Sequence, residues 1–432
     1  MELPIQFLER MKKMLGEEYE EFLASYEQER AYGMRINTLK LDVDSALKLL
    51  PFSLEPIPWC ETGFYYSKGE RPGKHAFHEA GLYYIQEPSA MITAELAEII
   101  PGEHVLDLCA APGGKSTQLA CKMQGKGVLV SNEINPQRAA ALSQNIERMG
   151  IKNAIVTNES PEKLSRYMMS YFDKIVVDAP CSGEGMFKKE ALAVSEWSPE
   201  KVESCAKRQR EILESADVML KPGGRLVYST CTFSEQENED VIQGFIQGHP
   251  EYEIIDMHRI WPHKVKGEGH FAAVLQKNGE STYIYKEEKA PRLERSRQMQ
   301  VEEFMKSVLQ TTLEGKIFPF GDHLYLLPMH APELKGLKVL RPGLHLGSFK
   351  KNRFEPAHAL SHALNVHDCR HVLNYTSEQG EVVRYLRGEA LEGKAQEKGW
   401  YLVCVEGISL GFAKYSNEMF KNHYPKGLRI VG

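Results

Sequence analysis

The chain of 432 residues has no long apolar run, and no stretch approaches the roughly 18 residues that a membrane-spanning helix needs. Residues 1–4 carry no basic segment followed by an apolar stretch, so no secretory signal peptide is predicted. The 8 cysteines form no CxxC pair and no zinc-finger spacing with histidine. This argues against a disulfide scaffold and against a structural zinc site. We therefore expect a reduced, cytoplasmic protein without a bound metal.

The sequence also lacks an excess of positive charge, because 53 Lys and Arg against 59 Asp and Glu give a formal net charge of −6. Proteins that coat nucleic acid are usually basic, so this total argues mildly against that class. Two acidic segments account for it: residues 1–30 carry a net charge of −4 and residues 235–256 one of −7, which leaves the remainder at +5. We expect both segments to be solvent-exposed faces. In the second, the first turns of a helix would carry four acids that point away from a nucleic acid: Glu235, Glu237, Glu239 and Asp240.

The apolar pattern divides the chain into segments. The apolar pattern of residues 1–100 predicts a small mixed α/β unit. It indicates one amphipathic helix at 4–26, a strand at 33–39 and a helix at 45–50. Residues 281–300 carry mixed charges with little periodic apolarity, which is typical of a linker. Residues 301–432 contain short apolar runs between Gly and Pro, which predicts a strand-rich region.

Residues 101–280 alternate apolar strands with helical stretches. The strands are expected at 105–108, 128–131, 154–157, 175–178 and 226–229, and the main helices at 137–149 and 199–220. This alternation indicates α/β architecture, a doubly wound, Rossmann-like parallel sheet with right-handed crossovers. Ligands of such sheets bind at the carboxyl ends of the strands.

The turn after the first of these strands is rich in small residues, which let a ligand approach the backbone and the following helix closely. It comprises Cys109, Ala110, Ala111, Pro112, Gly113, Gly114 and Lys115. Glu133 follows the second strand, where nucleotide-binding folds carry the acid that binds ribose hydroxyls. The turn is not a Walker A loop, since Cys109 occupies the place of its first Gly, and it lacks GxGxxG. The turn and Glu133 together predict a ligand that contains a nucleoside. The alternative is that the turn only serves packing.

Two cysteines follow strands at the same edge of the sheet. Cys181 comes after Asp178, Ala179 and Pro180, and Cys231 lies between Thr230 and Thr232. Adjacent strands lie about 4.8 Å apart, so both thiols can face one substrate. A single strand-end cysteine is most often a small buried hydrophobe, but a pair among Pro, Gly, Ser and Thr favours chemistry.

Three blocks, at residues 107–117, 178–185 and 229–239, resemble the Nop/Sun family of RNA cytosine-5 methyltransferases. The order of the blocks and the spacing between them also resemble that family. The resemblance is greatest to the bacterial RsmF-type members, which act on 16S ribosomal RNA. Residues 340–347 are similar to the PUA-like RNA-binding domain that ends such proteins. The resemblance implies a Rossmann-like methyltransferase domain, a C-terminal PUA-like domain and S-adenosylmethionine as cofactor.

The same resemblance implies the roles of individual residues. Cys231 would add to carbon 6 of cytosine, which makes carbon 5 nucleophilic enough to accept a methyl group. Cys181 would assist release of the product, Asp178 would contact ring nitrogen 3, and Pro180 would line the base pocket. The cofactor would lie against residues 109–115, Glu133, Asp178 and Ser160; the last stands where family members often carry an Asp that holds the adenine amino group.

Two other classes of function are weighed against this one. A DNA methyltransferase is disfavoured because its nucleophile is the cysteine of the Pro-Cys block, whereas this chain also has Cys231. An RNA-binding assembly factor that kept the fold without the chemistry is disfavoured because Cys181, Cys231 and Asp178 are all present.

The expected RNA contacts are Lys188 beside the catalytic block and Lys350, Lys351 and Arg353 in the C-terminal region. The last three belong to residues 334–354, which hold six Lys or Arg and no Asp or Glu. Phe349 and Phe354 are candidates for stacking on bases, although a basic run is often just a solvated face. Arg35 and Lys40 are weaker candidates. We expect a monomer whose partner is 16S rRNA or the small ribosomal subunit.

Overall fold

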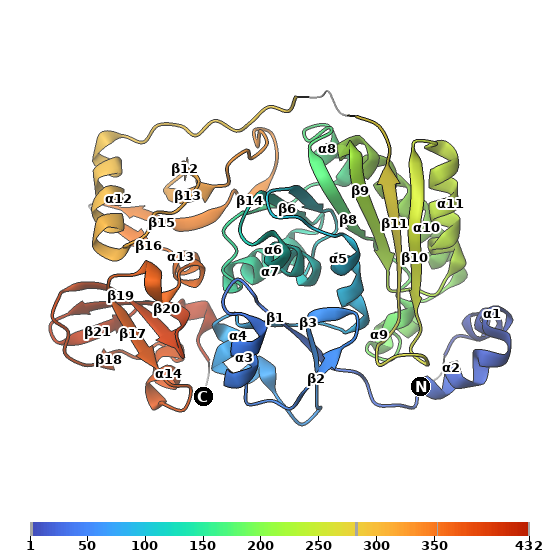
Figure 1. Ribbon diagram of the computed structural model, residues 1–432, viewed down its shortest axis with the longest axis horizontal. Coiled ribbons are helices and arrows are strands. Elements are labelled where there is room, and N and C mark those ends of the chain that lie inside the picture. Colours follow the sequence, from blue (N-terminus) through green and yellow to red (C-terminus); the bar gives the residue numbers. More distant parts are fainter. Residues whose placement is uncertain (1–2, 281–283, 352, 431–432) are drawn as a thin grey trace.

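We describe residues 3–280, 284–351 and 353–430 of the protein from a computed structural model; residues 281–283 of the expected linker lie outside these ranges. The centre is an 8-stranded sheet in the order β10-β11-β9-β8-β5-β6-β7-β14 (Figure 1). Its parallel strands are β5 (His104–Asp107), β6 (Val128–Asn132), β7 (Ala154–Thr157), β8 (Phe172–Asp178) and β9 (Leu220–Thr230). The expected doubly wound sheet is confirmed.

Helices cover both faces of this sheet. Successive residues of a strand point to opposite faces, so Val105 of β5 packs into one apolar core and Leu106 into another. The first core contains residues of α5 (Ile92–Leu96), α6 (Gly114–Met123) and α7 (Pro136–Arg148). The second contains residues of α8 (Pro161–Ser165), α10 (Pro199–Met219) and α11 (Glu239–Gly248).

Antiparallel strands complete both edges of the sheet. β11 (His270–Lys277) pairs with β9, and β10 (Tyr252–Ile260) pairs with β11. At the opposite edge, β14 (Val339–Arg341) comes from the C-terminal region and pairs with β7. The methyl-transferring and C-terminal parts expected from the sequence therefore share one sheet.

The N-terminal unit is a 4-stranded sheet in the order β2-β3-β1-β4. Its elements are β1 (Gly33–Ile36), α3 (Val43–Leu49), β2 (Leu54–Ile57), β3 (Cys60–Tyr66), α4 (Ala76–Glu79) and β4 (Tyr83–Ile85). The single helix expected at 4–26 is wrong: α1 (Ile5–Leu15) and α2 (Tyr19–Ser25) are separated by a 3₁₀ turn, Gly16–Glu18. Gly16 ends α1 because it adopts φ +54°, a conformation that glycine takes without steric cost.

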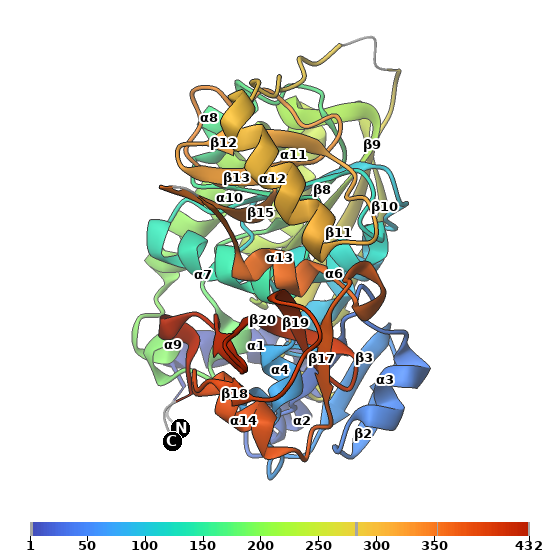
Figure 2. The same ribbon diagram turned by 90° about the vertical axis from the view of Figure 1, so that its left-hand side faces the viewer.

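The C-terminal region contains two sheets. The first, in the order β12-β13-β15-β16, consists of β12 (Lys316–Phe320), β13 (His323–Leu327), β15 (Leu344–Lys350) and β16 (Arg353–Pro356). The second, in the order β17-β19-β20-β21-β18, consists of β17 (Val372–Tyr375), β18 (Leu391–Glu392), β19 (Gly399–Val405), β20 (Ile408–Ser416) and β21 (Met419–Asn422). The helices are α12 (Arg295–Val308), α13 (His358–Ala363) and α14 (Gly380–Leu386) (Figure 2). Residues 295–300, expected in the linker, thus form the beginning of α12.

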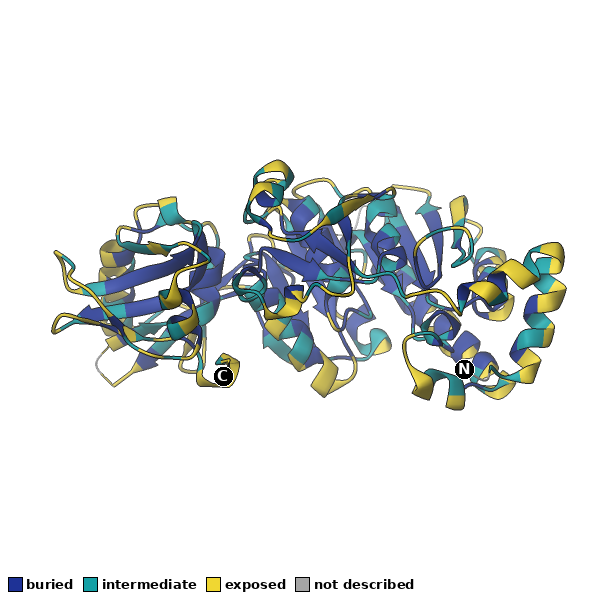
Figure 3. Ribbon diagram, turned by 90° about the horizontal axis from the view of Figure 1, so that it is seen from below, coloured by how far each residue is buried: buried dark blue, intermediate teal, exposed yellow. Residues whose placement is uncertain are grey.

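The two ends of the chain share one apolar core. Met34 and Phe77 of the N-terminal unit pack in the same cluster as Tyr385 and Leu410 of the last sheet. Figure 3 shows buried residues along the strands and exposed residues on the outer sides of the helices. Within the described ranges, none of the helices combines the length and apolar character that crossing a membrane requires.

Candidate active site

A cavity of about 1110 Å³ lies at the carboxyl ends of the parallel strands. Its walls include residues that follow five neighbouring strands: Cys109 after β5, Glu133 after β6, Ser160 after β7, Cys181 after β8 and Cys231 after β9. The topology therefore brings the first residue of the predicted loop, Cys109, and the predicted thiols to one cavity, as expected for an open α/β sheet.

The loop after β5 turns sharply into α6. Gly113 has φ +118°, and a Cβ there would lie 3.2 Å from Leu142 Cδ1, so the turn needs glycine. Beneath it, Ser116 Oγ donates a 2.7 Å hydrogen bond to fully buried Asp107, whose pKa is raised by burial to about 7. Burial also raises the pKa of the Cys109 thiol, which suits a wall of the cavity better than a nucleophile.

Hydrogen bonds from neighbouring elements hold the loop in place. Arg138 Nη2 of α7 donates to the carbonyl oxygen of Ala111 at 2.8 Å, and Asn145 Nδ2 donates to that of Pro112 at 2.9 Å. The Ala110 N–H donates to the carbonyl oxygen of Asn132 at 2.8 Å. The loop is thus held in place beside the cavity, and of its residues 109–115 only Cys109 lines the wall.

Glu133 and Ser160 line the cavity beside this loop. Glu133 is only 3% exposed, accepts a 2.9 Å hydrogen bond from the Asn135 N–H and lies 3.4 Å from Arg138 Nη1. Ser160 caps α8, because its Oγ accepts from the Lys163 N–H at 3.2 Å. Its hydroxyl proton can still be donated to a ligand.

The sulfur atoms of Cys181 and Cys231 lie 3.4 Å apart, and both are free thiols that line the cavity. The contact with Cys231, together with burial, raises the pKa of the Cys181 thiol well above the ordinary value. Cys181 is therefore a neutral thiol, able to give a proton, beside the second sulfur. The Gly185 N–H donates to the carbonyl oxygen of Cys231 at 2.8 Å and joins the two loops.

Asp178 stands at the end of β8, where the loop and the thiols meet. Its Oδ2 lies 2.8 Å from Nζ of Lys115, and its Oδ1 accepts from Ser229 Oγ at 3.0 Å. Burial raises the pKa of Asp178, but several opposing effects, of which the charge of Lys115 is the largest, together hold it below the usual value. His270 Nε2 lies 3.9 Å away; burial lowers the pKa of this histidine to about 3, so it is neutral. The carboxylate is thus ionised and aimed at the cavity that it lines.

Glu237 corrects the expectation of a solvent-exposed acidic turn. Glu235 and Asp240 are exposed, but Glu237 is fully buried. Its Oε1 accepts from the Ser182 N–H at 2.8 Å and from Gln209 Nε2 at 3.2 Å, and burial raises its pKa to about 7. An acidic cluster in the sequence is typical of a surface, so the sequence gives no signal for this burial.

The expected RNA contacts divide into accessible and structural residues. Lys350 and Lys351 are exposed, Arg353 pairs with Glu355 at 2.6 Å, and half-buried Lys188 donates to the carbonyl oxygen of Glu29 at 3.4 Å. The expectation of stacking by Phe349 and Phe354 is wrong, because both lie in an apolar core. Arg341, Arg35 and Lys40 also serve the fold: Arg341 is buried beside Glu147, Arg35 donates to Thr117 Oγ1 at 2.7 Å, and Lys40 Nζ donates to Ser409 Oγ at 3.0 Å.

Sequence reasoning missed three cationic residues on the wall of the cavity, one of which is Arg138 of α7. Lys201 and Arg208 line it from α10, and Arg208 is exposed. The sequence predicts α10 as a helix but does not tell which side of it meets the cavity. These two side chains add positive charge to the side where the thiols lie.

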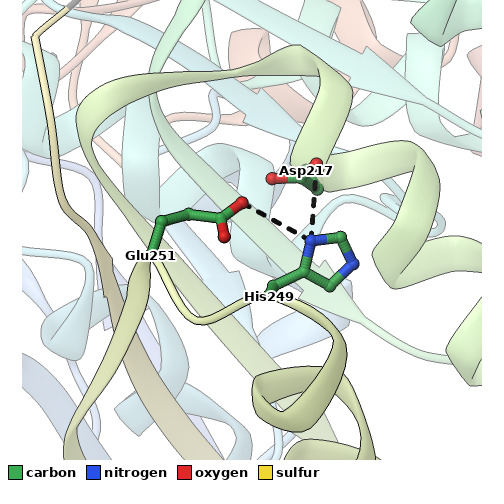
Figure 4. A group of neighbouring side chains, drawn as sticks. All are labelled: Asp217, His249 and Glu251. Carbon is green, nitrogen blue, oxygen red and sulfur yellow. Dashed lines mark ion pairs between the residues drawn. The ribbon is translucent and has the colours of Figure 1, made fainter.

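A second cluster of ionisable side chains lies away from this cavity, where α10 ends and β10 begins (Figure 4). His249 Nδ1 is 3.8 Å from Asp217 Oδ2 and 3.5 Å from Glu251 Oε1. The geometry would allow a metal ion, but Lys277 Nζ already lies 2.6 Å from Asp217 Oδ1. We interpret the cluster as a group of ion pairs that supports the start of β9.

Comparison with known families gives matches along nearly the whole chain. The description "16S rRNA methyltransferase RsmB/F" matches residues 95–276, and the "N-terminal domain of 16S rRNA methyltransferase RsmF" matches residues 3–88. The "RsmF rRNA methyltransferase first C-terminal domain" matches residues 303–364, and the "Methyltransferase RsmF PUA domain" matches residues 373–430. The segment 340–347, expected to belong to the PUA-like domain, lies in the preceding match.

Individual relatives agree with these matches. Ribosomal RNA small subunit methyltransferase F of Erwinia tasmaniensis is 31% identical over 465 residues, covering 98% of this chain and 96% of that protein. The protein of the same name from Vibrio vulnificus is 32% identical over 99% of this chain and 97% of its own length. Among solved structures, a methyltransferase homolog protein from Pyrococcus horikoshii has a TM-score of 0.58 and 29% identity, covering 63% of this chain and 94% of that one.

Proposed function

Because the chain belongs to the RsmF family of 16S rRNA methyltransferases, we propose that it transfers a methyl group from S-adenosylmethionine to carbon 5 of a cytosine in 16S rRNA. The observation that carries this proposal is the 3.4 Å contact between the Cys181 and Cys231 sulfur atoms in one cavity with Asp178. A methyl transfer to a nucleophilic nitrogen would require neither thiol. Two thiols and a carboxylate suit the methylation of a ring carbon, because such a carbon must be activated before it can accept a methyl group.

The residues that follow β5, β6 and β7 fit the cofactor. S-adenosylmethionine supplies an electrophilic methyl group on a sulfonium sulfur. Buried Glu133 is available to accept hydrogen bonds from ribose hydroxyls, and Ser160 to donate one to the adenine. The turn at Gly113 lets a ligand approach the backbone at the start of α6. A cavity of about 1110 Å³ exceeds the roughly 300–1000 Å³ of ordinary single-ligand pockets, which leaves room for a base beside the cofactor.

Covalent catalysis by Cys231 would activate the cytosine. Its thiolate adds to carbon 6 while ring nitrogen 3 takes a proton from solvent, and carbon 5 becomes enamine-like and takes the methyl group. Ionised Asp178 accepts the hydrogen bond of protonated nitrogen 3. A base such as water then removes the proton from carbon 5, and the double bond between carbons 5 and 6 re-forms as the bond between sulfur and carbon 6 breaks. Cys231 leaves as a thiolate, and nitrogen 3 returns its proton to solvent.

Cys181 would serve the last step. As a neutral thiol in contact with the other sulfur, it can protonate the departing Cys231 thiolate and return the proton afterwards. Pro180 lines the same cavity and would flank the base, which must leave its stack to reach the thiols.

Transfer of a labelled methyl group tests the proposal directly. The full chain is incubated with unmodified 16S rRNA, with assembled small subunits and with a DNA copy of the same sequence, and the labelled base is mapped. We expect 5-methylcytosine in rRNA. Label on adenine, or on DNA only, would overturn the proposed reaction.

A further inference from the structure

Glu237 lies between the loops that carry the two thiols. Its carboxylate accepts hydrogen bonds from the N–H and hydroxyl groups of Ser182 and from Thr232 Oγ1. Ser182 directly follows Cys181, and Thr232 directly follows Cys231. The two hydroxyl oxygens also lie 2.9 Å from each other. One carboxylate thus contacts the residue after each thiol.

The surroundings of Glu237 make a carboxylate at this place costly. The side chain is fully buried, and among the described residues no ion pair includes it. Taking a carboxylate out of water without a cation costs free energy that only hydrogen bonds offset here. Gln209 Nε2, which donates to both Glu237 Oε1 and the Pro180 carbonyl oxygen, supplies one from α10.

The neighbouring Asn238 holds the Cys231 loop from its other side. Thr230 Oγ1 donates to Asn238 Oδ1 at 2.6 Å, and Asn238 Nδ2 donates to the carbonyl oxygen of Thr232 at 3.0 Å. These bonds hold the side chain of Thr230 and the backbone of Thr232, on either side of Cys231, but do not reach Cys181. The carboxylate of Glu237 reaches both loops because it is an acceptor with two oxygens.

We propose that Glu237 is a positioning residue that holds the Cys181 and Cys231 thiols in contact across the two loops. It touches neither sulfur nor substrate and acts through Ser182 and Thr232. This inference rests on the proposed covalent reaction, in which one sulfur adds to the base while the other serves its release. Both steps need the sulfur atoms at a fixed separation, because a misplacement of about 1 Å can cost about a hundredfold in rate.

Glu237→Gln tests the proposal, because the amide keeps the size of the side chain but places an NH₂ group against the donors. Exposed Glu235→Gln, two residues earlier in the same turn, is the matched control. We expect kcat to fall about a hundredfold with KM for RNA and cofactor unchanged within about twofold. A loss through KM alone, or activity equal to that of Glu235→Gln, would overturn the proposal.

The spacing of the thiols is measured independently with phenylarsine oxide, which binds two close thiols and releases water. Cys181→Ala and Cys231→Ala define the background from the other cysteines. We expect Glu237→Gln to bind the reagent at least about tenfold more weakly than Glu235→Gln, following the loss of fixed geometry. Equal binding by the two variants would contradict the positioning role.

A second variant covers the case in which Glu237→Gln does not fold. Ser182→Ala keeps the buried carboxylate and removes one donor, and it should weaken reagent binding and kcat in the same direction. If the wild-type chain fails to form 5-methylcytosine while the arsenical still separates the variants, the proposed reaction falls and the positioning role stands.

Discussion

Lys115 Nζ lies 2.8 Å from Asp178 Oδ2, and this ion pair connects the loop after β5 with the end of β8. Lys115 lies in the first turn of α6, directly after the glycine turn. Asp178 is the last residue of β8, two residues before Pro180. A cation from the loop after β5 thereby lowers the pKa of a carboxylate that lines the cavity. We therefore expect a substitution of Lys115 in the loop to change the pH dependence of the reaction.

Lys115→Met should move the acidic limb of the pH profile. Lys115 lowers the pKa of Asp178 against the effect of burial, so its removal raises that pKa. If ionised Asp178 is the active form, kcat/KM should begin to fall at a higher pH in the variant than in the wild type. Profiles of kcat/KM between about pH 4.5 and 8 measure this. Exposed Lys126→Met is the control, and coincident acidic limbs in all three proteins would contradict the prediction.

Cys231→Ala should abolish methyl transfer while leaving cofactor binding intact. Removal of a covalent nucleophile elsewhere costs about a millionfold, so we expect a loss of at least about a thousandfold. Labelled methyl transfer to rRNA measures the rate, and calorimetric titration with S-adenosylmethionine measures binding. Residual activity within tenfold of the wild type would assign the nucleophile elsewhere.

Cys181→Ala should accumulate a covalent complex with RNA. Addition by Cys231 would proceed, but the variant lacks the neutral thiol that lies 3.4 Å from the departing sulfur. A denaturing gel after incubation with rRNA and cofactor should show a slower protein band. The double variant Cys181→Ala with Cys231→Ala should lack this band; its persistence there, or its absence from the single variant, would refute the proposed roles.

The sequence predicts the central sheet well because alternating apolar stretches report local burial. The strand expected at 154–157 coincides with β7, and the one expected at 226–229 forms the end of β9. The earlier part of β9 contains Gly223 and Gly224, which in a sequence are typical of a turn. The candidate site follows from the same topology, because the strand ends carry the loop and both thiols.

Features that depend on distant partners could not be predicted. β14 joins the edge of the sheet beside β7, although about 180 residues separate Thr157 from Val339. Phe349 and Phe354 lie within a basic segment, yet both are buried, because Phe354 packs against Phe304 and Phe349 packs against Phe354. The buried carboxylate of Glu237 depends on hydrogen bonds from Ser182 and Gln209, which lie 55 and 28 residues away in sequence.

The exposed lysines at the end of β15 should contribute to RNA binding through phosphate charge. Lys350 and Lys351 are exposed, and Figure 1 shows their strand on the opposite side of the molecule from α1. Replacement of both by Ala should make the slope of log K against log salt less negative by about 1.5, since each phosphate contact contributes about 0.7–0.9. Filter binding to 16S rRNA at several salt concentrations measures the slope.

The matched control for this prediction is the double replacement of Lys12 and Lys13, which are exposed on α1. It removes the same charge at a distant place, so a purely global effect would change both slopes equally. Arg353→Ala should change the slope less than either lysine, because Glu355 already pairs with its guanidinium. Thermal unfolding of the Lys350 and Lys351 variant should match the wild type, since exposed substitutions rarely affect stability. An unchanged slope would contradict phosphate contacts by Lys350 and Lys351.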